Sequence, residues 1–261
     1  MAEGSSSIPT YPDLTGKIAL VTGGSKGIGA ATCRMLAAND VRLAVNARSE
    51  SGIEALVSEL RADGADAIGI SADCTKSGEV EQMVARTEQE LGQVDILLPY
   101  AGGFRAFLPI EDVTEEDWRE VLDANLTSTF LAVKAVLPSM LERRGGVIVT
   151  MASNAGRQLD KLLTAPYAAA KAGVIQFTRH IAMELGGHGI RVNSIAPATV
   201  LSERVERIMD EQSRNRVAEM SPLGRMGTPE DCALATLFLV SDSASWLTGV
   251  TLDVAGGRIM L

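Results

Sequence analysis

Residues 17–29 read Lys-Ile-Ala-Leu-Val-Thr-Gly-Gly-Ser-Lys-Gly-Ile-Gly, and this stretch decides the fold. Its first half is a short apolar run typical of a buried strand, and its second half is a glycine-rich turn. A helical pattern follows over residues 27–38. Glycines let a ligand approach the backbone closely, and the free N–H groups at the helix start attract a phosphate. The stretch therefore predicts the first unit of a dinucleotide-binding sheet, although a purely structural turn is the alternative.

The rest of the chain alternates apolar strands with helical stripes. Ile53, Leu56, Val57 and Leu60 recur at the spacing of one helix face, and three acidic residues after Thr114 suit the start of a long helix. Such alternation predicts a parallel sheet with helices on both faces. We therefore expect an α/β fold with a Rossmann-type, doubly wound sheet of about seven strands. The expected strands are residues 17–22, 41–46, 67–71, 94–98, 146–151, 191–196 and 250–254.

Length and composition indicate one catalytic domain. The chain has 261 residues, of which only 4% are aromatic while aliphatic residues are abundant, as suits a buried sheet covered by helices. We see no repeat and no internal linker. We therefore expect a flexible N-terminal tail over residues 1–12 and a single dinucleotide-binding catalytic domain over residues 13–261.

The net charge and the cysteine content limit the classes of partner, metal site and cellular compartment that we expect. The net charge of −9 and the lack of a long basic run argue against nucleic acid or a membrane as partner, although an acidic balance also fits plain solubility. Cys33, Cys74 and Cys232 lack metal-ligand spacing, so we expect reduced thiols, a cytoplasmic protein and no metal site. We find neither a signal-like run nor an apolar stretch long enough to span a bilayer.

A second informative stretch runs from Ser153 to Lys171. Tyr167 and Lys171 lie four residues apart among small helix formers, so they share one helix face. An ammonium beside a phenol lowers the phenol's pKa from about 10, and acid–base work near neutrality needs roughly two to three units of lowering. Ser153 follows the apolar run 147–151 and would lie at the end of a strand, where open α/β sheets bind ligands. A surface Tyr–Lys pair is the alternative for this pair alone.

The end of the second strand bears on the choice of dinucleotide. An NAD site usually places an acidic residue there to hold the ribose 2′-hydroxyl. This chain has Ala47 followed by Arg48, and Arg48 could pair with a 2′-phosphate. Lys26 in the glycine turn supplies a second cation, although either could be a solvated surface charge. Together they favour NADP(H), with NAD(H) possible.

In chain order, Gly23-x-x-x-Gly27-x-Gly29, Asn125, Ser153 and Tyr167-x-x-x-Lys171 resemble the short-chain dehydrogenase/reductase family. The resemblance covers about residues 14–257 and is greatest to the single-domain members, including 3-oxoacyl-ACP reductases. It implies that Tyr167 moves the proton, that Ser153 hydrogen-bonds the substrate oxygen, and that the protein is a homotetramer. Lys171 would hold the nicotinamide ribose and tune Tyr167, and Asn125 would keep a water in the proton relay. The implied cofactor-binding residues are Gly23, Ser25, Lys26, Gly27, Ile28, Gly29, Arg48, Asp73, Cys74, Ala101, Gly102, Tyr167, Lys171, Pro197, Val200 and Ser202.

Two of these residues have an alternative role. Asn125 interrupts an otherwise largely apolar helical stripe, and a buried amide needs partners, which neighbouring backbone could supply instead of a water. Asp73 matches the family's adenine-contacting aspartate, but a loop cap is equally plausible.

Several positions depart from the family pattern. Pro99 and Tyr100 replace two asparagines, which removes side-chain bonds that tie this turn to its neighbours. Ala198 replaces a glycine after Pro197, and Ala255 replaces an aspartate. Ser202 stands where a threonine often meets the carboxamide of the cofactor.

These residues predict hydride transfer between nicotinamide and a ketone or secondary alcohol. The alternatives are an NAD-dependent sugar or polyol dehydrogenase and a non-catalytic dinucleotide-binding regulatory protein. Residues 198–221 would form a mobile lid or a fixed helix pair. The residues that we expect to shape specificity are Phe104, Arg105, Phe107, Arg157, Leu159, Leu162 and Leu163.

Overall fold

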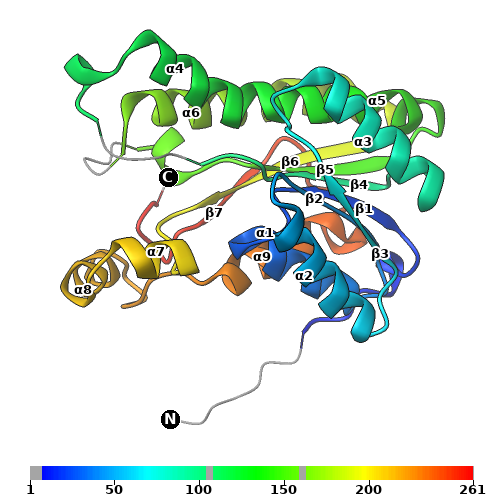
Figure 1. The fold of residues 1–261 in the computed structure, drawn as a ribbon, viewed down its shortest axis with the longest axis horizontal. Helices are drawn as coiled ribbons and strands as arrows, with labels where there is room; N and C mark the ends of the chain where they lie inside the picture. Colours follow the sequence, from blue (N-terminus) through cyan, green and yellow to red (C-terminus); the bar gives the residue numbers. More distant parts are fainter. Residues whose placement is uncertain (1–7, 104–107, 159–162, 261) are drawn as a thin grey trace.

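Seven parallel strands form one sheet in a computed structural model that describes residues 8–103, 108–158 and 163–260 (Figure 1). Their order is β3-β2-β1-β4-β5-β6-β7, which confirms the expected doubly wound sheet. The order reverses between β1 and β4, and ligands bind at such a switch point, beyond the carboxyl ends of the strands. The strands are β1 Ile18–Thr22, β2 Arg42–Ala47, β3 Ala67–Ser71, β4 Ile96–Pro99, β5 Gly146–Met151, β6 Ile190–Pro197 and β7 Thr251–Val254.

Helices cover both faces of the sheet (Figure 1). One layer holds α1 Gly27–Ala37, α2 Glu50–Ala62 and α9 Pro229–Val240. The other holds α3 Ser77–Glu90, α4 Glu115–Leu122, α5 Ser128–Glu142 and α6 Ala165–Leu185. Two short helices, α7 Glu203–Ile208 and α8 Glu211–Glu219, form an excursion between β6 and α9. The remaining turns are η1 Pro12–Leu14, η2 Ile110–Asp112, η3 Asp123–Thr127, η4 Asn154–Gly156, η5 Gly186–His188 and η6 Asp242–Ala244.

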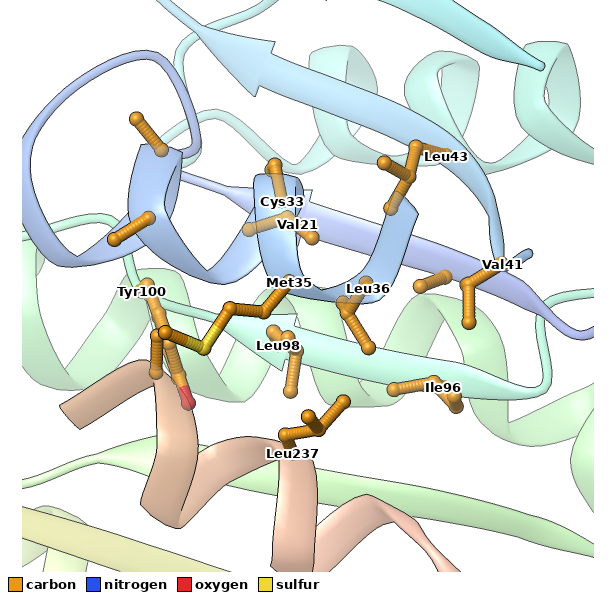
Figure 2. Close-up of a cluster of buried hydrophobic side chains, with 14 of the residues drawn as sticks. Val21, Cys33, Met35, Leu36, Val41, Leu43, Ile96, Leu98, Tyr100 and Leu237 are labelled. Atoms are coloured by element: carbon orange, nitrogen blue, oxygen red, sulfur yellow. The ribbon is translucent and has the colours of Figure 1, made fainter. Parts of the chain in front are cut away.

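Each face of the sheet has its own apolar core. Figure 2 shows the core under α1 and α9, where Leu36 and Leu237 meet Leu98 of the sheet. Each of these leucines is at most 1% exposed, and burying such a side chain stabilises the fold by about 1.5–3 kcal/mol. Both faces of the strands are covered, so the strands read as continuous apolar runs rather than as an alternation.

The long helix expected from Thr114 differs from the prediction. A π-turn, η3, divides it into α4 and α5, and a capping box between Thr114 and Asp117 starts α4. Asn125 lies within this turn and is fully buried. The apolar stripe continues on both sides of the turn, so hydrophobic spacing alone did not reveal the inserted residue.

The structure bears on two further expectations, one about the N-terminal residues and one about apolar stretches. Residues 8–12 were expected to be loose, but Asn39 accepts a hydrogen bond from Tyr11 N (2.7 Å) and donates one to Pro9 O (3.1 Å).

The helical run Glu115–Glu142 is, by length and composition, apolar enough to cross a bilayer, contrary to our expectation. Val133, Val136 and Met140 of this run pack into the core against the sheet, as in the core helix of a globular domain.

Tyr100 ties the turn after β4 to α9, in place of the family's asparagines. Its hydroxyl lies 2.6 Å from Thr236 Oγ1, which itself donates to Cys232 O (2.9 Å). Because that donation uses the single threonine proton, the phenol is the donor in the Tyr100–Thr236 bond. Burial raises the pKa of Tyr100 and so keeps it a neutral donor. Ala101 N also donates to Thr22 Oγ1 (3.1 Å), which holds the turn against β1.

Tyr100→Phe tests the hydrogen bond between Tyr100 and Thr236. It removes one buried hydrogen bond and leaves Thr236 bonded to Cys232, so the free energy of unfolding should fall by about 1 kcal/mol. Thr236→Val strands the buried phenol and should cost more, about 1–3 kcal/mol. Urea unfolding of both variants and of the double variant measures the coupling between the two side chains. Additive effects would contradict the proposed bond.

Candidate active site

The glycine turn after β1 has no room for a side chain at Gly23 or at Gly29. Gly23 has a φ of +64°, and a Cβ there would lie 2.8 Å from Tyr100 O. A Cβ on Gly29 would collide with the carbonyl oxygen of Gly23. The turn leads into α1, whose N-cap residue, Lys26, makes no side-chain capping bond. The free N–H groups of α1 therefore suit a pyrophosphate, with Ser25 just before the N-cap residue and Ile28 in the first turn of the helix.

Arg48 lies at the rim of an open groove beside the carboxyl ends of β2 and β3. Arg48, Asp73, Thr75 and Lys76 line one side of the groove, and residues 114–124 of the α4 region supply the rest. Asp73 Oδ1 accepts bonds from Thr75 N (2.9 Å) and Thr75 Oγ1 (2.8 Å). The backbone bond from Thr75 is the main cause that lowers the pKa of Asp73. Asp73 thus caps this loop, and its contact with adenine stays a prediction.

Cys74 and Asn46 fasten the neighbouring strand ends. The Cys74 thiol donates to Asn46 Oδ1 (3.1 Å), and Asn46 Nδ2 donates to Ile70 O and Ala72 O (3.0 and 3.2 Å). Burial raises the pKa of the Cys74 thiol to about 11, so it remains a protonated donor at neutral pH. Sequence reasoning had missed Asn46, whose signal was a polar residue inside an apolar strand.

The turn that carries Ser153 packs directly on the backbone of α6. Ser153 is the N-cap of η4, and a Cβ on Gly156 would lie 2.6 Å from both Ala172 N and Lys171 C. Only glycine permits this approach. Ser153 Oγ accepts from Ala155 N and donates to Asn154 Oδ1, both at 3.2 Å. These bonds are long, so the hydroxyl can turn toward another acceptor at small cost.

Lys171 joins α6 to the end of β5. Its Nζ donates to Met151 O (2.8 Å), two residues before Ser153, and lies 5.6 Å from the centroid of the Tyr167 ring. The lysine is 3% exposed. Burial lowers the pKa of Lys171 to about 7, because desolvation disfavours the ammonium form. Lys171 therefore links the Tyr167 ring to the end of β5 that precedes Ser153, and the catalytic roles of the three residues stay predictions.

Asn125 holds the turn after β4. Its Oδ1 accepts from Gly103 N (2.9 Å), and its Nδ2 donates to Gly103 O and to Val121 O, both at 2.8 Å. Leu126 beside it packs against Gly173 of α6, so the π-turn lies next to the helix of Tyr167 and Lys171. Backbone groups thus satisfy the amide, which was one of the two readings of the sequence. The water-holding role stays a prediction.

The segment after β6 lies near the glycine turn. Ser202 caps α7 by accepting from Val205 N (3.5 Å), and its Cβ lies 3.9 Å from the position of a Cβ on Gly27. Val200 pairs with Gly227, and Ala198 N donates to Val254 O (3.1 Å), which ties the turn after Pro197 to β7. The α7–α8 excursion is thus anchored where it leaves the sheet.

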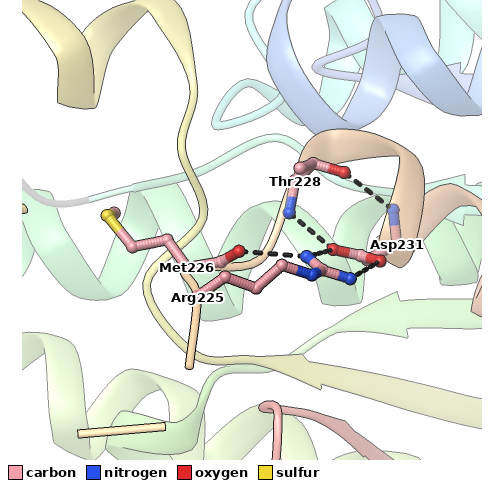
Figure 3. Close-up of polar contacts among 4 residues, drawn as sticks. All are labelled: Arg225, Met226, Thr228 and Asp231. Carbon is pink, nitrogen blue, oxygen red and sulfur yellow. Dashed lines mark hydrogen bonds and ion pairs between the residues drawn. The ribbon is translucent and has the colours of Figure 1, made fainter. Parts of the chain in front are cut away.

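The excursion is equally firmly held where it returns. Figure 3 shows the Arg225 guanidinium clamping both carboxylate oxygens of Asp231, at 2.6 and 2.8 Å. Asp231 also accepts from Thr228 N (2.7 Å), which completes a capping box at the start of α9. The helix pair that the sequence offered as one alternative is present, and its movement stays a prediction.

Some expected residues lie outside the described part of the chain or have another role. Phe104, Arg105, Phe107, Leu159 and Leu162 fall on residues that the structure does not describe. Arg157 was expected to shape specificity, but its guanidinium is engaged by Asp253 and by the Thr251 carbonyl. Among the described residues, no group of His, Cys, Asp or Glu is arranged to hold a metal ion.

Comparisons with known proteins agree with this geometry. The short chain dehydrogenase family matches residues 17–213. The chain is 39% identical to the 3-oxoacyl-[acyl-carrier-protein] reductase of Synechocystis sp., over 95% of this chain and 98% of that one. It is 38% identical to the reductase FabG of Escherichia coli, over 94% and 98%. A solved 3-oxoacyl-[acyl-carrier protein] reductase with bound NAD, from Brucella melitensis, is 29% identical and superposes with a TM-score of 0.90, over 96% and 94%.

This chain belongs to the short-chain dehydrogenase family. It is an oxidoreductase that interconverts a carbonyl and a CH–OH group with a nicotinamide dinucleotide. The close-packed glycines and the uncapped start of α1 have the chemistry that the phosphates of such a cofactor require.

Lys171→Met tests the cost of burying the lysine in the cofactor-free protein. The folded-state pKa is lowered from 10.5 to about 7, so the unfolded chain binds a proton that the folded chain lacks within this window. The destabilising contribution of the buried lysine therefore grows as the pH falls through this window, and it reaches its full size below about pH 7. The methionine variant should gain about 1–3 kcal/mol at pH 7, allowing for the unpaired Met151 carbonyl, and less at pH 10.

Urea unfolding at the two pH values measures this difference. Lys134→Met, which changes an exposed lysine on α5, is the control and should show no such pH dependence. A constant difference between wild type and Lys171→Met at both pH values would contradict the lowered pKa.

Proposed function

We propose that this protein is an NADP(H)-dependent carbonyl reductase of the 3-oxoacyl-ACP reductase type, with Tyr167 as the acid–base residue. The observation that carries the proposal is the junction of α6 with the end of β5. There the buried Lys171 amine lies beside the Tyr167 ring, and the Ser153 turn rests on the helix backbone. A phenol, an amine and a hydroxyl gathered beyond the carboxyl ends of parallel strands are what proton transfer to a carbonyl oxygen requires.

Each residue has a distinct task in this proposal. The dinucleotide supplies the hydride when bound. Ser153 donates its hydroxyl proton to a hydrogen bond with the substrate oxygen, after exchanging its long bond to Asn154. Tyr167 delivers the proton to that oxygen, and positive charge on Lys171 favours the resulting phenolate. Asn125 keeps the turn after β4 in place through Gly103.

The cofactor-binding set of the proposal follows the strand ends. Gly23, Ser25, Lys26, Gly27, Ile28 and Gly29 would receive the pyrophosphate, and Arg48 the 2′-phosphate. Asp73, Cys74, Ala101, Gly102, Pro197, Val200 and Ser202 would line the rest of the dinucleotide, and Lys171 would reach the nicotinamide ribose. The absence of a carboxylate at Ala47 favours the phosphorylated cofactor. NAD(H) use is the second candidate, because the solved Brucella melitensis relative binds NAD.

The proposal extends to assembly and location. We propose a homotetramer in the cytoplasm, with α4–α5, α6 and the region of β7 as interfaces. Large apolar side chains are exposed on all three: Phe130 on α5, Met183 on α6, and Trp246 before β7, the last at 98%. Such exposure in a chain with an otherwise well-buried core indicates contact with a further copy. All three cysteines are free and buried, as suits a reducing compartment.

Tyr167→Phe is the central test of the mechanism. Removing the hydroxyl should lower turnover at least about 100-fold, the usual scale of acid–base catalysis, while NADPH still binds. The measurement is NADPH oxidation with a broad panel of ketones, together with NADPH binding by fluorescence. Tyr11→Phe, at a tyrosine near the N-terminus, is the matched control. Near-normal turnover in Tyr167→Phe would refute the role, and no reduction of any ketone by the wild type would favour a regulatory protein.

Arg48→Ala tests the choice of cofactor. We expect NADPH to bind more tightly than NADH in the wild type, and the variant to lose about 1.5–3 kcal/mol of that preference, because a charge-assisted bond to the 2′-phosphate is lost. Dissociation constants for both cofactors, at one salt concentration, measure it. Arg86→Ala, which removes an exposed charge on α3, is the control. Equal affinities of the wild type for the two cofactors would contradict the assignment.

A further inference from the structure

An ion pair joins the turn that carries Ser153 to the last strand of the sheet. Arg157 follows η4 directly, and its backbone N–H donates to Asn154 O (2.9 Å). Its guanidinium extends to β7, where Nη1 donates to Thr251 O (3.2 Å) and Nε lies 3.4 Å from Asp253 Oδ1. The two side chains are 15% and 21% exposed, so the pair is largely shielded from water.

Asp253 depends on Arg157 for its charge balance. Its Oδ1 atom is buried and has no hydrogen-bond partner among the described residues. Burial raises the pKa of Asp253, and the charge of Arg157 opposes that rise. Removing one partner of a shielded pair leaves an uncompensated charge, which is more costly than removing both. The carboxylate on β7 is therefore a reason for Arg157 to remain against this strand.

The other side of the same turn is fixed by α6. Gly156 leaves no space between η4 and the helix backbone at Lys171 and Ala172. The turn is thus held between α6 on one side and β7 on the other. The Ser153 hydroxyl itself makes only two bonds of 3.2 Å, both within its own turn. Its position consequently depends on where the whole turn lies.

We propose that Arg157 is a positioning residue for the reaction: through its ion pair with Asp253 it fixes the turn that aims the Ser153 hydroxyl at the substrate oxygen. The inference rests on the proposed function, because it takes Ser153 as the group that orients that oxygen. A shift of about 1 Å in a reacting group can lower a rate about 100-fold, so a small movement of the turn is enough to matter.

Arg157→Met tests this role, with Arg42→Met as the matched control. Arg42 makes the same two kinds of contact, from Nε to Asp66 Oδ2 (2.7 Å) and from Nη1 to Leu91 O (2.6 Å). It does so at the start of β2, at the opposite end of the strands from the site. The probes are NADPH and ethyl acetoacetate, a small 3-oxo ester.

We expect kcat to fall at least about tenfold in Arg157→Met, while the dissociation constant of NADPH stays within about twofold of the wild type. Arg42→Met should keep its kcat. The double variant Arg157→Met/Asp253→Leu leaves no carboxylate unpaired but still lacks the tie to β7, so its kcat should stay low; recovery of kcat in it would assign the loss to the unpaired carboxylate and overturn the proposal. Unchanged kcat in Arg157→Met, or equal losses in Arg157→Met and Arg42→Met, would overturn the proposal.

Amide hydrogen exchange separates this inference from the proposed function. If the wild type reduces no ketone, the proposed function fails, but exchange still reports on the turn. Ala155 N donates to Ser153 Oγ and Gly156 N to Ser153 O. Both amides should exchange at least about tenfold faster in Arg157→Met and at the wild-type rate in Arg42→Met. Unchanged exchange at these amides would overturn the positioning role whatever the activity.

Discussion

The hydrogen bond from the buried Lys171 amine to the carbonyl of Met151 is the interaction on which the rest of the site depends. It fastens α6 to the end of β5, two residues before Ser153. Gly156 then brings the following turn against the same helix. Burying an amine is unfavourable, and its lowered pKa expresses that cost. A site that retains such a group accepts lower stability in return for a positioned, titratable amine beside the Tyr167 ring.

The turn after β4 shows how one geometry is kept by different residues. The family's two asparagines are absent, yet the turn is bonded on three sides. Thr22 receives the N–H of Ala101, Asn125 brackets the peptide groups of Gly103, and Tyr100 extends through the apolar layer to Thr236 on α9. The Tyr100 side chain reaches further than an asparagine side chain could. Its aromatic ring also fills part of the core shown in Figure 2. Satisfying buried polar groups, and not the identity of one side chain, is what the turn requires.

Charge is unevenly distributed between the two halves of the site. Arg48 and Lys26 are exposed cations on the side of β2 and the glycine turn. On the side of β5 and β7, the cation of Arg157 already has a partner in Asp253. In the proposed function these cations would meet the phosphates of the cofactor, whereas Ser153 and Tyr167 would face the substrate. This distribution of charge suits a substrate that presents a neutral carbonyl group better than one that presents a strongly charged group.

Local patterns in the sequence determined the seven strands, the glycine cradle, the spacing of Tyr167 and Lys171, and membership of the short-chain dehydrogenase family. These features depend on residues close together in the chain, where strand and helix periodicities and glycine's missing side chain act directly. Only the tertiary structure decided that Asn125 lies in a π-turn bonded to Gly103, that Tyr100 reaches Thr236, and that Arg157 binds β7 rather than a ligand. Each of these is a contact between residues 22 to 136 positions apart. Such partners are chosen by the packing of layers, which places side chains together according to the order of the strands and not their order along the chain.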